Sequence, residues 1–330
     1  MVYKDAPMGL TASVLGASGY TGAELLRLLA GHPALAVEVA GARSHAGSAV
    51  GDVHPHLRAH LSGTFVTPAE AAAHSADVCF SCLPSGALTE ILDDVAAPIV
   101  VDLSGDHRAT FGWTYGLVEH ARADLPSATR IANPGCYPTA ALLCLVPFAR
   151  ADVIGDPIVV DALSGVSGAG TSLDETHLFS ALHGSASAYG STTHRHVPEI
   201  ERGLTTFAAT SATVSFTPHL VPMARGLLVT ARAPLTTSAL DDDSALDVLR
   251  AAYANELFIS VIEQWPSTKA VVGTNRALIS ARVDVRAGML VASAAIDNLG
   301  KGAAGQAIQN ANLALSLDEG SGLEAIATWP

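Results

Sequence analysis

The chain has 330 residues, of which 49% are hydrophobic and 15% are charged, and its net charge at pH 7 is −13. At the usual ~100–200 residues per domain, this length suggests two domains. The apolar share is enough for a sizeable core, and the charged share is too low for a disordered chain. The acidic balance argues against a nucleic-acid partner, because binding phosphates requires a basic patch.

No stretch has the pattern of a membrane span or a signal peptide. The longest apolar run, Ala140 to Phe148, is about half the roughly 18 residues that a span requires, and Pro147 interrupts it. The N-terminal stretch MVYKDAPMGL lacks the apolar core of a secretory signal. We therefore expect no membrane partner and a cytoplasmic location.

The first half of the chain alternates short apolar runs with helical or loop segments. The first run, Leu10–Leu15, leads through GASGYTG into a helix that Gly31 and Pro33 end. Strands that alternate with helices are typical of a parallel α/β sheet. Four further runs are expected to be strands of this sheet: 34–44, 76–86, 97–108 and 129–136.

After about Ala151 the pattern changes to longer apolar stretches with turns between them, which indicate a mixed or antiparallel sheet. Helices are expected over 244–256 and 300–317. The predicted fold class is therefore α/β, with a Rossmann-type parallel-sheet domain and a second, α+β domain that has a mixed sheet. The stretches expected to form this second sheet are 156–170, 212–222, 225–235 and 277–298.

Gly16, Gly19 and Gly22 lie where the first strand turns into the first helix. Glycines there let a dinucleotide pyrophosphate approach the backbone and rest on the helix N-terminus. The spacing G-x-x-G-x-x-G also suits a plain structural turn, but the strand before it and the helix after it favour nucleotide binding. Arg43 and Ser44 end the second strand, where an arginine favours NADP over NAD, unless Arg43 is simply a surface residue.

Cys136 lies between a Pro-Gly turn and an apolar helical run. Unpaired N–H groups at a helix start favour an anion, so we expect a lowered thiol pKa and donors that can hold an oxyanion. From these features alone, a nucleophile and a helix-start core residue are equally open interpretations. Cys144, inside the run, is expected to be core packing. Cys79 and Cys82 form a C-x-x-C within an expected strand, without a second pair, which disfavours redox or metal use.

A thiolate nucleophile needs a partner base, and the stretch STTHRHVPEIERG supplies candidates. His196 is the candidate general acid/base and Arg195 a candidate anion ligand, whereas a hydrogen-bonded structural role is favoured for His194. An H-x-H pair can bind a metal, but no third ligand follows nearby, so we expect no metal site. A second group of histidines is expected to be solvated in a loop: His54, His56 and His60.

Two more stretches follow expected strands. Arg108, in DLSGDHR, is a candidate anion clamp. The stretch SGVSGAG, 164–170, offers small residues and N–H donors to a cleft, although a structural turn explains it equally well. Ligands of open α/β sheets bind outside the carboxyl ends of the strands, so the strand-end turns are expected to surround one crevice.

The chain resembles the N-acetyl-gamma-glutamyl-phosphate reductases, an arginine-pathway family related to the aspartate-semialdehyde dehydrogenases. The matching motifs run in order over nearly the whole chain, and the most specific are NPGCYPTA and HRHVPEI. Two small departures are His107, where an aromatic residue is expected, and Val118 in YGLVE. The other matching motifs are GASGYTGAELLRLL, CLPSG, DLSGDHR, SGVSGAG, FTPHLVPMARG and DNLGKGAAGQAIQN.

The resemblance implies NADPH-dependent reduction of N-acetyl-gamma-glutamyl phosphate to N-acetyl-glutamate 5-semialdehyde and phosphate. Cys136 would form a thioester, His196 would move a proton, and Asn298 would lie near the nicotinamide. The family also implies a homodimer or homotetramer, and a last helix that returns to the dinucleotide domain. The expected domain ranges are 1–155 with 300–330 for the dinucleotide domain and 156–299 for the catalytic domain.

Residues and motifs together define two expected sites. The substrate site, besides Cys136 and His196, comprises Arg108, Asn133, Ser164, His194, Arg195 and Glu199. The cofactor site comprises Gly16, Ser18, Gly19, Tyr20, Thr21, Gly22, Arg43, Ser44, Cys82, Leu83, Pro84, Ser104, Ser167, Gly168 and Asn298.

Three alternatives stay open. The same chemistry on aspartyl phosphate is the nearest, and substrate profiling separates it because the acetamido group demands a larger pocket. A thiol acyl-transferase or hydrolase predicts turnover without NADPH, and the glycine turn at Gly16 argues against it. A binding protein that senses NADP predicts tight dinucleotide binding and an ordinary thiol pKa at Cys136.

Overall fold

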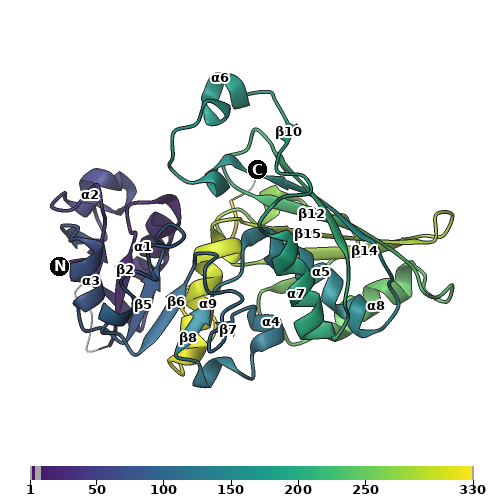
Figure 1. The fold of residues 1–330 in the computed structure, drawn as a ribbon, viewed down its shortest axis with the longest axis horizontal. Helices are drawn as coiled ribbons and strands as arrows, with labels where there is room; N and C mark the ends of the chain where they lie inside the picture. Colours follow the sequence, from purple (N-terminus) through teal and green to yellow (C-terminus); the bar gives the residue numbers. More distant parts are fainter. Residues whose placement is uncertain (1, 4–8, 329–330) are drawn as a thin grey trace. The chain divides into compact units, whose positions relative to one another are not determined.

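The computed structural model describes residues 2–3 and 9–328. This part of the chain divides into two compact units, each with its own sheet (Figure 1). The chain passes from one unit to the other at Gly135, earlier than the predicted boundary after residue 155, because the helix that starts at Cys136 packs on the second sheet. Unit 1 comprises the described residues up to Gly135 and Ala303–Ala325, and unit 2 comprises Cys136–Gly302 and 326–328.

Unit 1 is built on a six-stranded sheet in the order β3-β2-β5-β6-β8-β7, and every pairing in it is parallel. All four residues of β5 are buried, as expected for a strand covered on both faces. The predicted Rossmann-type parallel sheet is therefore confirmed. The strands are β2 (Leu10–Leu15), β3 (Leu35–Gly41), β5 (Val78–Ser81), β6 (Ile99–Asp102), β7 (Thr114–Tyr115) and β8 (Arg130–Ala132), with a separate antiparallel pair, β1 (Val2–Tyr3) and β4 (Ser62–Gly63).

The helices of unit 1 connect its strands. The α3 helix begins with a capping box in which Thr67 and Glu70 bond each other's backbone N–H groups, which is typical of a Thr-x-x-Glu start. The last helix, α9, packs against β6 and α1 within the same unit. The helices are α1 (Tyr20–Gly31), α2 (Val50–Val53), α3 (Pro68–Ala73), α4 (Val118–Ala121) and α9 (Gly305–Ala314).

The start of the last helix differs from the prediction. An α-helix is expected from residue 300, but the segment Gly300–Ala304 is a π-helical turn and α9 begins after it. The Gly302 N–H donates to the Asp297 carbonyl at 2.9 Å, which skips one residue more than an α-helical bond does. Gly300 also lies so close to the Thr274 carbonyl that no side chain fits there. The wider turn follows from these two close backbone contacts.

Unit 2 contains a seven-stranded sheet in the order β10-β11-β9-β12-β15-β14-β13. The β9/β11 and β13/β14 pairs are parallel and the other four pairs are antiparallel. This is the mixed sheet that the longer apolar stretches predict, so that prediction is confirmed. The strands are β9 (Ile158–Ser164), β10 (Ser187–Ala188), β11 (Val214–Leu220), β12 (Leu227–Pro234), β13 (Ile259–Val261), β14 (Ala277–Asp284) and β15 (Met289–Ile296).

The central helix of unit 2 is α5, which packs against β12, β14 and β15 and against two other helices (Figure 1). Every residue from Tyr137 to Ala149 is buried, which explains why the run is apolar on all sides. In the described part of the chain, no helix is long and apolar enough to cross a membrane. The helices of unit 2 are α5 (Cys136–Arg150), α6 (Phe179–Leu182), α7 (Val197–Ala208) and α8 (Asp242–Ala252).

Pro147 lies inside α5 without ending it. Proline has no N–H, so the carbonyl of Leu143, four residues earlier, loses its helical partner. The hydroxyl of Tyr253, which follows α8, donates to this Leu143 carbonyl at 2.6 Å. A side chain from another helix end therefore replaces the missing backbone bond, and α5 continues to Arg150.

Candidate active site

Cys136 is the first residue of α5 and is half-buried. The N–H groups of a first helical turn have no acceptor within the helix, so this end carries partial positive charge. Gly302 lies directly against the cysteine, since a Cβ on Gly302 would come within 2.8 Å of the Cys136 Cβ. Glycine at this position leaves room for the thiol, a requirement that no local pattern around Cys136 indicates.

The other three cysteines have a different environment. Burial raises the pKa of Cys79 to about 11 and that of Cys144 to about 12. Desolvation also raises the pKa of Cys82, and the nearby Asp102 adds to this shift. These thiols are free of disulfides and stay protonated near neutral pH, so they are poor nucleophiles. Cys144 lies in the core, as predicted.

Aromatic and imidazole rings gather beside Cys136. The rings of His194 and His196 lie 4.7 Å apart, centre to centre. The ring of Tyr137, the residue after Cys136, is 5.7 Å from His194 and 5.8 Å from His196. Phe216 of β11 packs 5.2 Å from both Tyr137 and His194. The fold thus brings the two predicted histidines to the residue that follows the predicted nucleophile.

The two histidines lie in different electrostatic settings. The His196 N–H donates to Nδ1 of His194 at 3.1 Å. Burial lowers the pKa of His194, Arg195 lowers it further, and Glu199 opposes this. His194 is therefore neutral near pH 7, and because its Nδ1 accepts, its proton lies on Nε2. His196 is buried at the N-cap of α7, and Glu199 is buried in the first turn of the same helix.

One cavity of about 490 Å³ within unit 2 is lined by Cys136, Tyr137 and the stretch 194–196, whereas Glu199 is not part of its lining. Its size is in the range of small-molecule sites. The lining combines a thiol, imidazoles, hydroxyls and the guanidinium of Arg195, so it can bind an anionic, oxygen-rich compound. Among the described residues, no group of three or more His, Cys, Asp or Glu side chains could hold a metal ion. Six predicted site residues line the cavity: Cys136, Ser164, Gly168, His194, Arg195 and His196.

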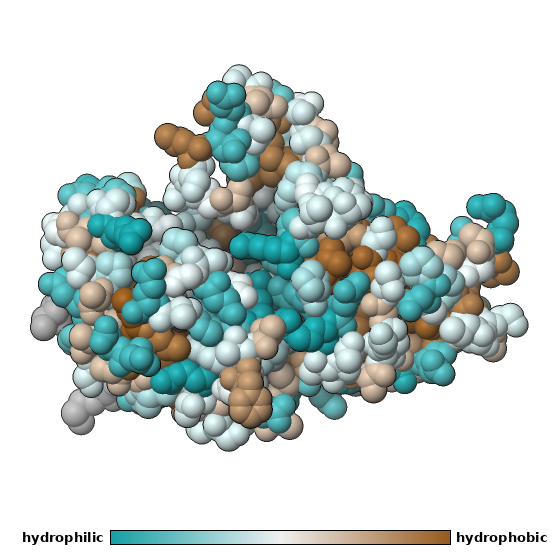
Figure 2. Space-filling model, in the orientation of Figure 1, coloured by the Kyte–Doolittle hydropathy of each residue, from teal (hydrophilic) through white to brown (hydrophobic). Residues whose placement is uncertain are grey.

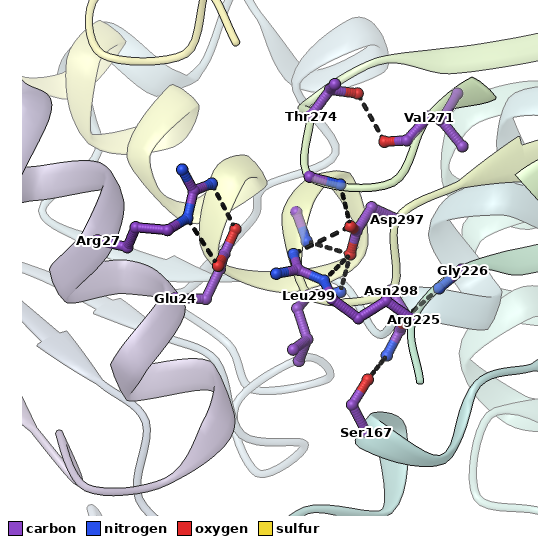
Figure 3. Close-up of polar contacts among 12 residues, drawn as sticks. Glu24, Arg27, Ser167, Arg225, Gly226, Val271, Thr274, Asp297, Asn298 and Leu299 are labelled. Atoms are coloured by element: carbon purple, nitrogen blue, oxygen red, sulfur yellow. Dashed lines mark hydrogen bonds and ion pairs between the residues drawn. The ribbon is translucent and has the colours of Figure 1, made fainter. Parts of the chain in front are cut away.

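The loop after β9 is held by Asn298. The Asn298 amide nitrogen donates to the Ser167 hydroxyl at 2.9 Å, and its amide oxygen accepts from the Gly226 N–H at 2.8 Å (Figure 3). Asn298 is buried, and Gly168 lies close to the Ser164 hydroxyl. The structure therefore gives Asn298 a scaffolding role, whereas its predicted contact with the cofactor stays a prediction.

Asp297, which the sequence analysis did not single out, organises the neighbouring turns (Figure 3). Its fully buried carboxylate pairs with Arg225 at 3.0 Å and accepts the N–H groups of Leu299 at 2.8 Å and Gly300 at 3.0 Å. It also accepts the Gly273 N–H at 2.5 Å. A buried carboxylate needs such partners, and here they fix the turn that leads to the π-helical segment. An Asp followed closely by Gly is the only local signal for this role.

In unit 1, the glycine turn is shaped by close backbone contacts. Gly16 has φ +74°, and a Cβ there would lie 2.6 Å from the Cys82 carbonyl oxygen. A Cβ on Gly22 would lie 2.5 Å from the Gly16 oxygen. Gly19 caps α1 without a side-chain bond, and no acid lies in the first turn, so the helix N-terminus suits a phosphate group. The other predicted residues of this turn are at least partly exposed: Ser18, Tyr20 and Thr21.

His54 differs from the expectation that it is a solvated loop residue. It is buried, and its Nε2–H donates to the Ala17 carbonyl at 2.9 Å. Its ring meets the edge of Phe65 at 5.9 Å, and burial lowers its pKa. The prediction is wrong for His54 because a long-range contact buries the ring under the glycine turn, whereas His56 and His60 are exposed.

The remaining cofactor candidates of unit 1 follow the carboxyl ends of its parallel strands. Arg43 and Ser44 come just after β3 and are exposed. Residues 82–84 follow β5. Ser104 follows β6, and its hydroxyl donates to the buried Asp102 at 2.8 Å. The carboxyl ends of parallel strands lie on the same side of the sheet. These residues therefore lie where ligands of such sheets bind.

Arg108 and Asn133 belong to unit 1, unlike the other predicted substrate residues. The Arg108 guanidinium donates to the carbonyls of Asn133 at 2.9 Å and Leu103 at 3.2 Å. Asn133 is almost fully buried, donates to the Ala303 carbonyl at 3.2 Å and accepts from Asn310 at 3.1 Å. Both side chains therefore fasten the end of β8, and their substrate roles stay predictions.

His107 takes the place of the aromatic residue expected there. Its ring stacks on Trp113 with centroids 4.0 Å apart and planes 14° apart. Its Nδ1 is 2.6 Å from the Asp102 carboxylate. The imidazole thus keeps the flat stacking surface of an aromatic ring and adds a polar contact to the buried acid.

Both units of the chain match domains of a known protein family. Residues 11–128 match the semialdehyde dehydrogenase NAD binding domain, and residues 136–298 match the semialdehyde dehydrogenase dimerisation domain. The chain is 44% identical to the N-acetyl-gamma-glutamyl-phosphate reductase of Acidothermus cellulolyticus, over 98% of this chain and 100% of that protein. It is 41% identical to a probable chloroplastic enzyme of that name from Arabidopsis thaliana, over 97% of this chain and 84% of that protein.

Solved structures show the same fold at low identity. Aspartate semialdehyde dehydrogenase II from Vibrio cholerae has a TM-score of 0.75 and 17% identity, covering 94% of this chain and 99% of that chain. The Candida albicans aspartate semialdehyde dehydrogenase with NADP has a TM-score of 0.73 and 18% identity, covering 92% and 98%. At this identity the likeness extends to the fold, which is the predicted one.

Proposed function

The chain belongs to the N-acetyl-gamma-glutamyl-phosphate reductase family, and we propose that it catalyses the NADPH-dependent reduction of N-acetyl-gamma-glutamyl phosphate. The products are N-acetyl-glutamate 5-semialdehyde and phosphate, and the step belongs to arginine biosynthesis. One observation carries this proposal: Cys136, at the start of α5, shares a cavity with His194, Arg195 and His196. A nucleophile, an acid/base and a cation are the groups that attack on an acyl phosphate requires.

The residues of unit 1 fit NADPH. The uncapped N-terminus of α1 and the glycines beneath it leave the backbone open to a pyrophosphate, and Arg43 would bind the 2′-phosphate. When bound, NADPH supplies the hydride that reduces the thioester. Further residues of the proposed cofactor site are Ser18, Tyr20, Thr21, Ser44, Cys82, Leu83, Pro84, Ser104, Ser167, Gly168 and Asn298.

The chemical steps centre on Cys136. His196 takes the thiol proton, and the thiolate attacks the acyl carbonyl. The N–H groups at the start of α5 hold the oxyanion, the bond to the phosphate oxygen breaks, and phosphate leaves a thioester on the sulfur. After reduction, the adduct on Cys136 collapses to the aldehyde, and His196 returns the proton to the departing thiolate. Residues proposed to hold the substrate's anionic and polar groups are Arg108, Asn133, Ser164, His194, Arg195 and Glu199.

The enzyme is proposed to work as a homodimer or homotetramer in the cytoplasm. The match of 136–298 to a dimerisation domain supports association of this chain with copies of itself. Exposed apolar side chains at Leu173, Leu178 and Phe179 offer surface that a second copy would cover. The part of unit 2 that carries α6 shows such brown, apolar atoms at its surface (Figure 2).

The test runs the reaction in reverse, which avoids the unstable acyl phosphate. Reduction of NADP⁺ by N-acetyl-glutamate 5-semialdehyde in the presence of phosphate is measured for the wild type and for Cys136→Ser. We expect wild-type activity and a loss of at least about a thousandfold in kcat for the variant, because a hydroxyl does not replace the thiolate. Cys144→Ala, eight positions on in the same helix, is the matched control and should keep its kcat.

The outcomes separate the alternatives. A Cys136→Ser enzyme with most of its activity would remove the thioester route. A wild type that is inactive here but active with aspartate 4-semialdehyde would leave the chemistry standing and change the substrate. Acyl transfer or hydrolysis without NADP⁺ would indicate a thiol enzyme without redox chemistry.

A further inference from the structure

Two tyrosine hydroxyls meet at the edge of the cavity in unit 2. Tyr137, next to Cys136, and Tyr189, 52 positions later, place their hydroxyl oxygens 2.7 Å apart. Both residues line the cavity. Apolar packing does not account for the hydroxyls, because the ring of Tyr137 already packs against the ring of Phe216. The pair is not used by the proposed steps at Cys136 and His196, so its hydroxyls need another explanation.

The burial of the two rings indicates the direction of the hydrogen bond. Tyr137 is 2% exposed and Tyr189 is 40% exposed. A buried hydroxyl hydrogen needs an acceptor. If Tyr137 donates to Tyr189, its hydrogen is satisfied, and the hydrogen of Tyr189 is left for the cavity. In the reverse direction the hydrogen of Tyr137 would turn to the Ser164 hydroxyl, its other side-chain hydrogen-bond partner.

Tyr189 is held firmly although its surroundings are exposed. Ala188 of β10 pairs with His219 of β11, and the Tyr189 N–H donates to the Pro218 carbonyl at 3.0 Å. Just beyond it, the hydroxyls of Ser191 and Thr217 lie 3.2 Å apart. The short β10 strand therefore fixes the tyrosine at the sheet edge, with its ring 5.8 Å from His194.

Both hydroxyls stay protonated in the working range of the enzyme. Burial raises the pKa of Tyr137 and that of Tyr189 above the usual value for tyrosine. Neither group can then act as a base near neutral pH, and each remains a hydrogen-bond donor. A neutral donor suits a carbonyl or carboxylate oxygen, whereas a phosphate dianion is better matched by an arginine.

We propose that Tyr189 contacts the non-phosphate end of the acyl substrate through its hydroxyl, and that Tyr137 is the positioning residue that orients this hydroxyl. This inference rests on the proposed function, because it assigns a role in binding that substrate. The bond would be made in the ground state and in the transition state alike. Its loss should therefore raise KM and leave kcat nearly unchanged.

The experiment uses the reverse reaction, which has separate KM values for the semialdehyde and for phosphate. Tyr189→Phe should raise the KM for the semialdehyde about tenfold, with kcat and the phosphate KM within about twofold of the wild type. Tyr137→Phe should raise the same KM about threefold. In the double variant the KM should equal that of Tyr189→Phe, because Tyr137 acts only through its partner.

Tyr253→Phe is the matched control. It also removes a buried tyrosine hydroxyl bond in unit 2, to the Leu143 carbonyl, but Tyr253 does not line the cavity. It should lower the thermal midpoint without changing either KM. A KM for the semialdehyde that is unchanged in an active Tyr189→Phe enzyme, effects that add in the double variant, or a rise confined to the phosphate KM would each overturn the proposal. An inactive wild type would instead overturn the proposed function, and this inference with it.

Discussion

The two candidate sites of this protein are built in different ways. The glycine turn of unit 1 is a contiguous stretch whose shape depends on backbone atoms. At both Gly16 and Gly22, an added Cβ would lie within 2.6 Å of another backbone atom. The cavity of unit 2 gathers side chains from α5, the segment around β10 and the start of α7. The shape of the first site therefore depends on backbone atoms, and that of the second depends on contacts between distant side chains.

The strongest test of this contrast is Gly16→Ala. A Cβ at φ +74° would lie 2.6 Å from the Cys82 carbonyl, and neither backbone segment can move without disturbing the sheet. We expect a loss of about 3–5 kcal/mol in the free energy of unfolding, followed by urea denaturation and circular dichroism. Gly19→Ala is the matched control, because its Cβ meets only the Gly16 oxygen at 3.8 Å and should cost under about 1 kcal/mol. Equal losses for the two variants would contradict a site shaped by close backbone approach.

The contrast also explains how much the sequence alone could predict. The parallel sheet and the glycine turn follow from local patterns, because strand, turn and helix are consecutive. Its place before an apolar helix makes Cys136 a candidate nucleophile, and that role stays a prediction. His54 could not be assigned correctly, because its burial depends on Ala17 and Phe65, which are distant in the chain.

Unit 2 shows the same limit more clearly. The pairing of Tyr137 with Tyr189 and the contact of Gly302 with Cys136 depend on how strands and helices pack, and no short pattern encodes them. The π-helical start of the last helix was missed for the same reason. An apolar period predicts a helix, but the close contact of Gly300 with Thr274 changes its first turn.

Gly302→Ala tests whether the position of Cys136 in the cavity of unit 2 also requires a close contact with a glycine. The new Cβ would lie 2.8 Å from the Cys136 Cβ, so the thiol must shift. A displacement near 1 Å at a nucleophile should lower kcat about 10–100-fold in the reverse assay, with the protein still folded. Gly31→Ala, where a Cβ meets nothing within 4 Å, is the control and should keep kcat. If Gly302→Ala kept full activity, the position of Cys136 would not depend on this contact.

The smallest expected effect concerns His54, the side chain that supports the backbone-built site. Burial lowers its pKa below the usual 6.5, the hydrogen bond to Ala17 opposes this shift, and His56 and His45 add to it. Its contribution to stability is therefore complete above about pH 6.5 and is lost as the pH falls toward the lower folded-state pKa, because the unfolded chain binds the proton first. The slope contributed is at most about 1.4 kcal/mol per pH unit.

His54→Gln separates this titration from the hydrogen bond. A glutamine amide can still donate to the Ala17 carbonyl, but it does not titrate. The free energy of unfolding, measured from pH 7.5 to pH 5.5, should therefore fall less steeply in the variant than in the wild type. His60→Gln removes an exposed imidazole and should leave the wild-type slope unchanged. Equal slopes in all three proteins would mean that His54 is protonated as easily in the folded protein as in the unfolded chain.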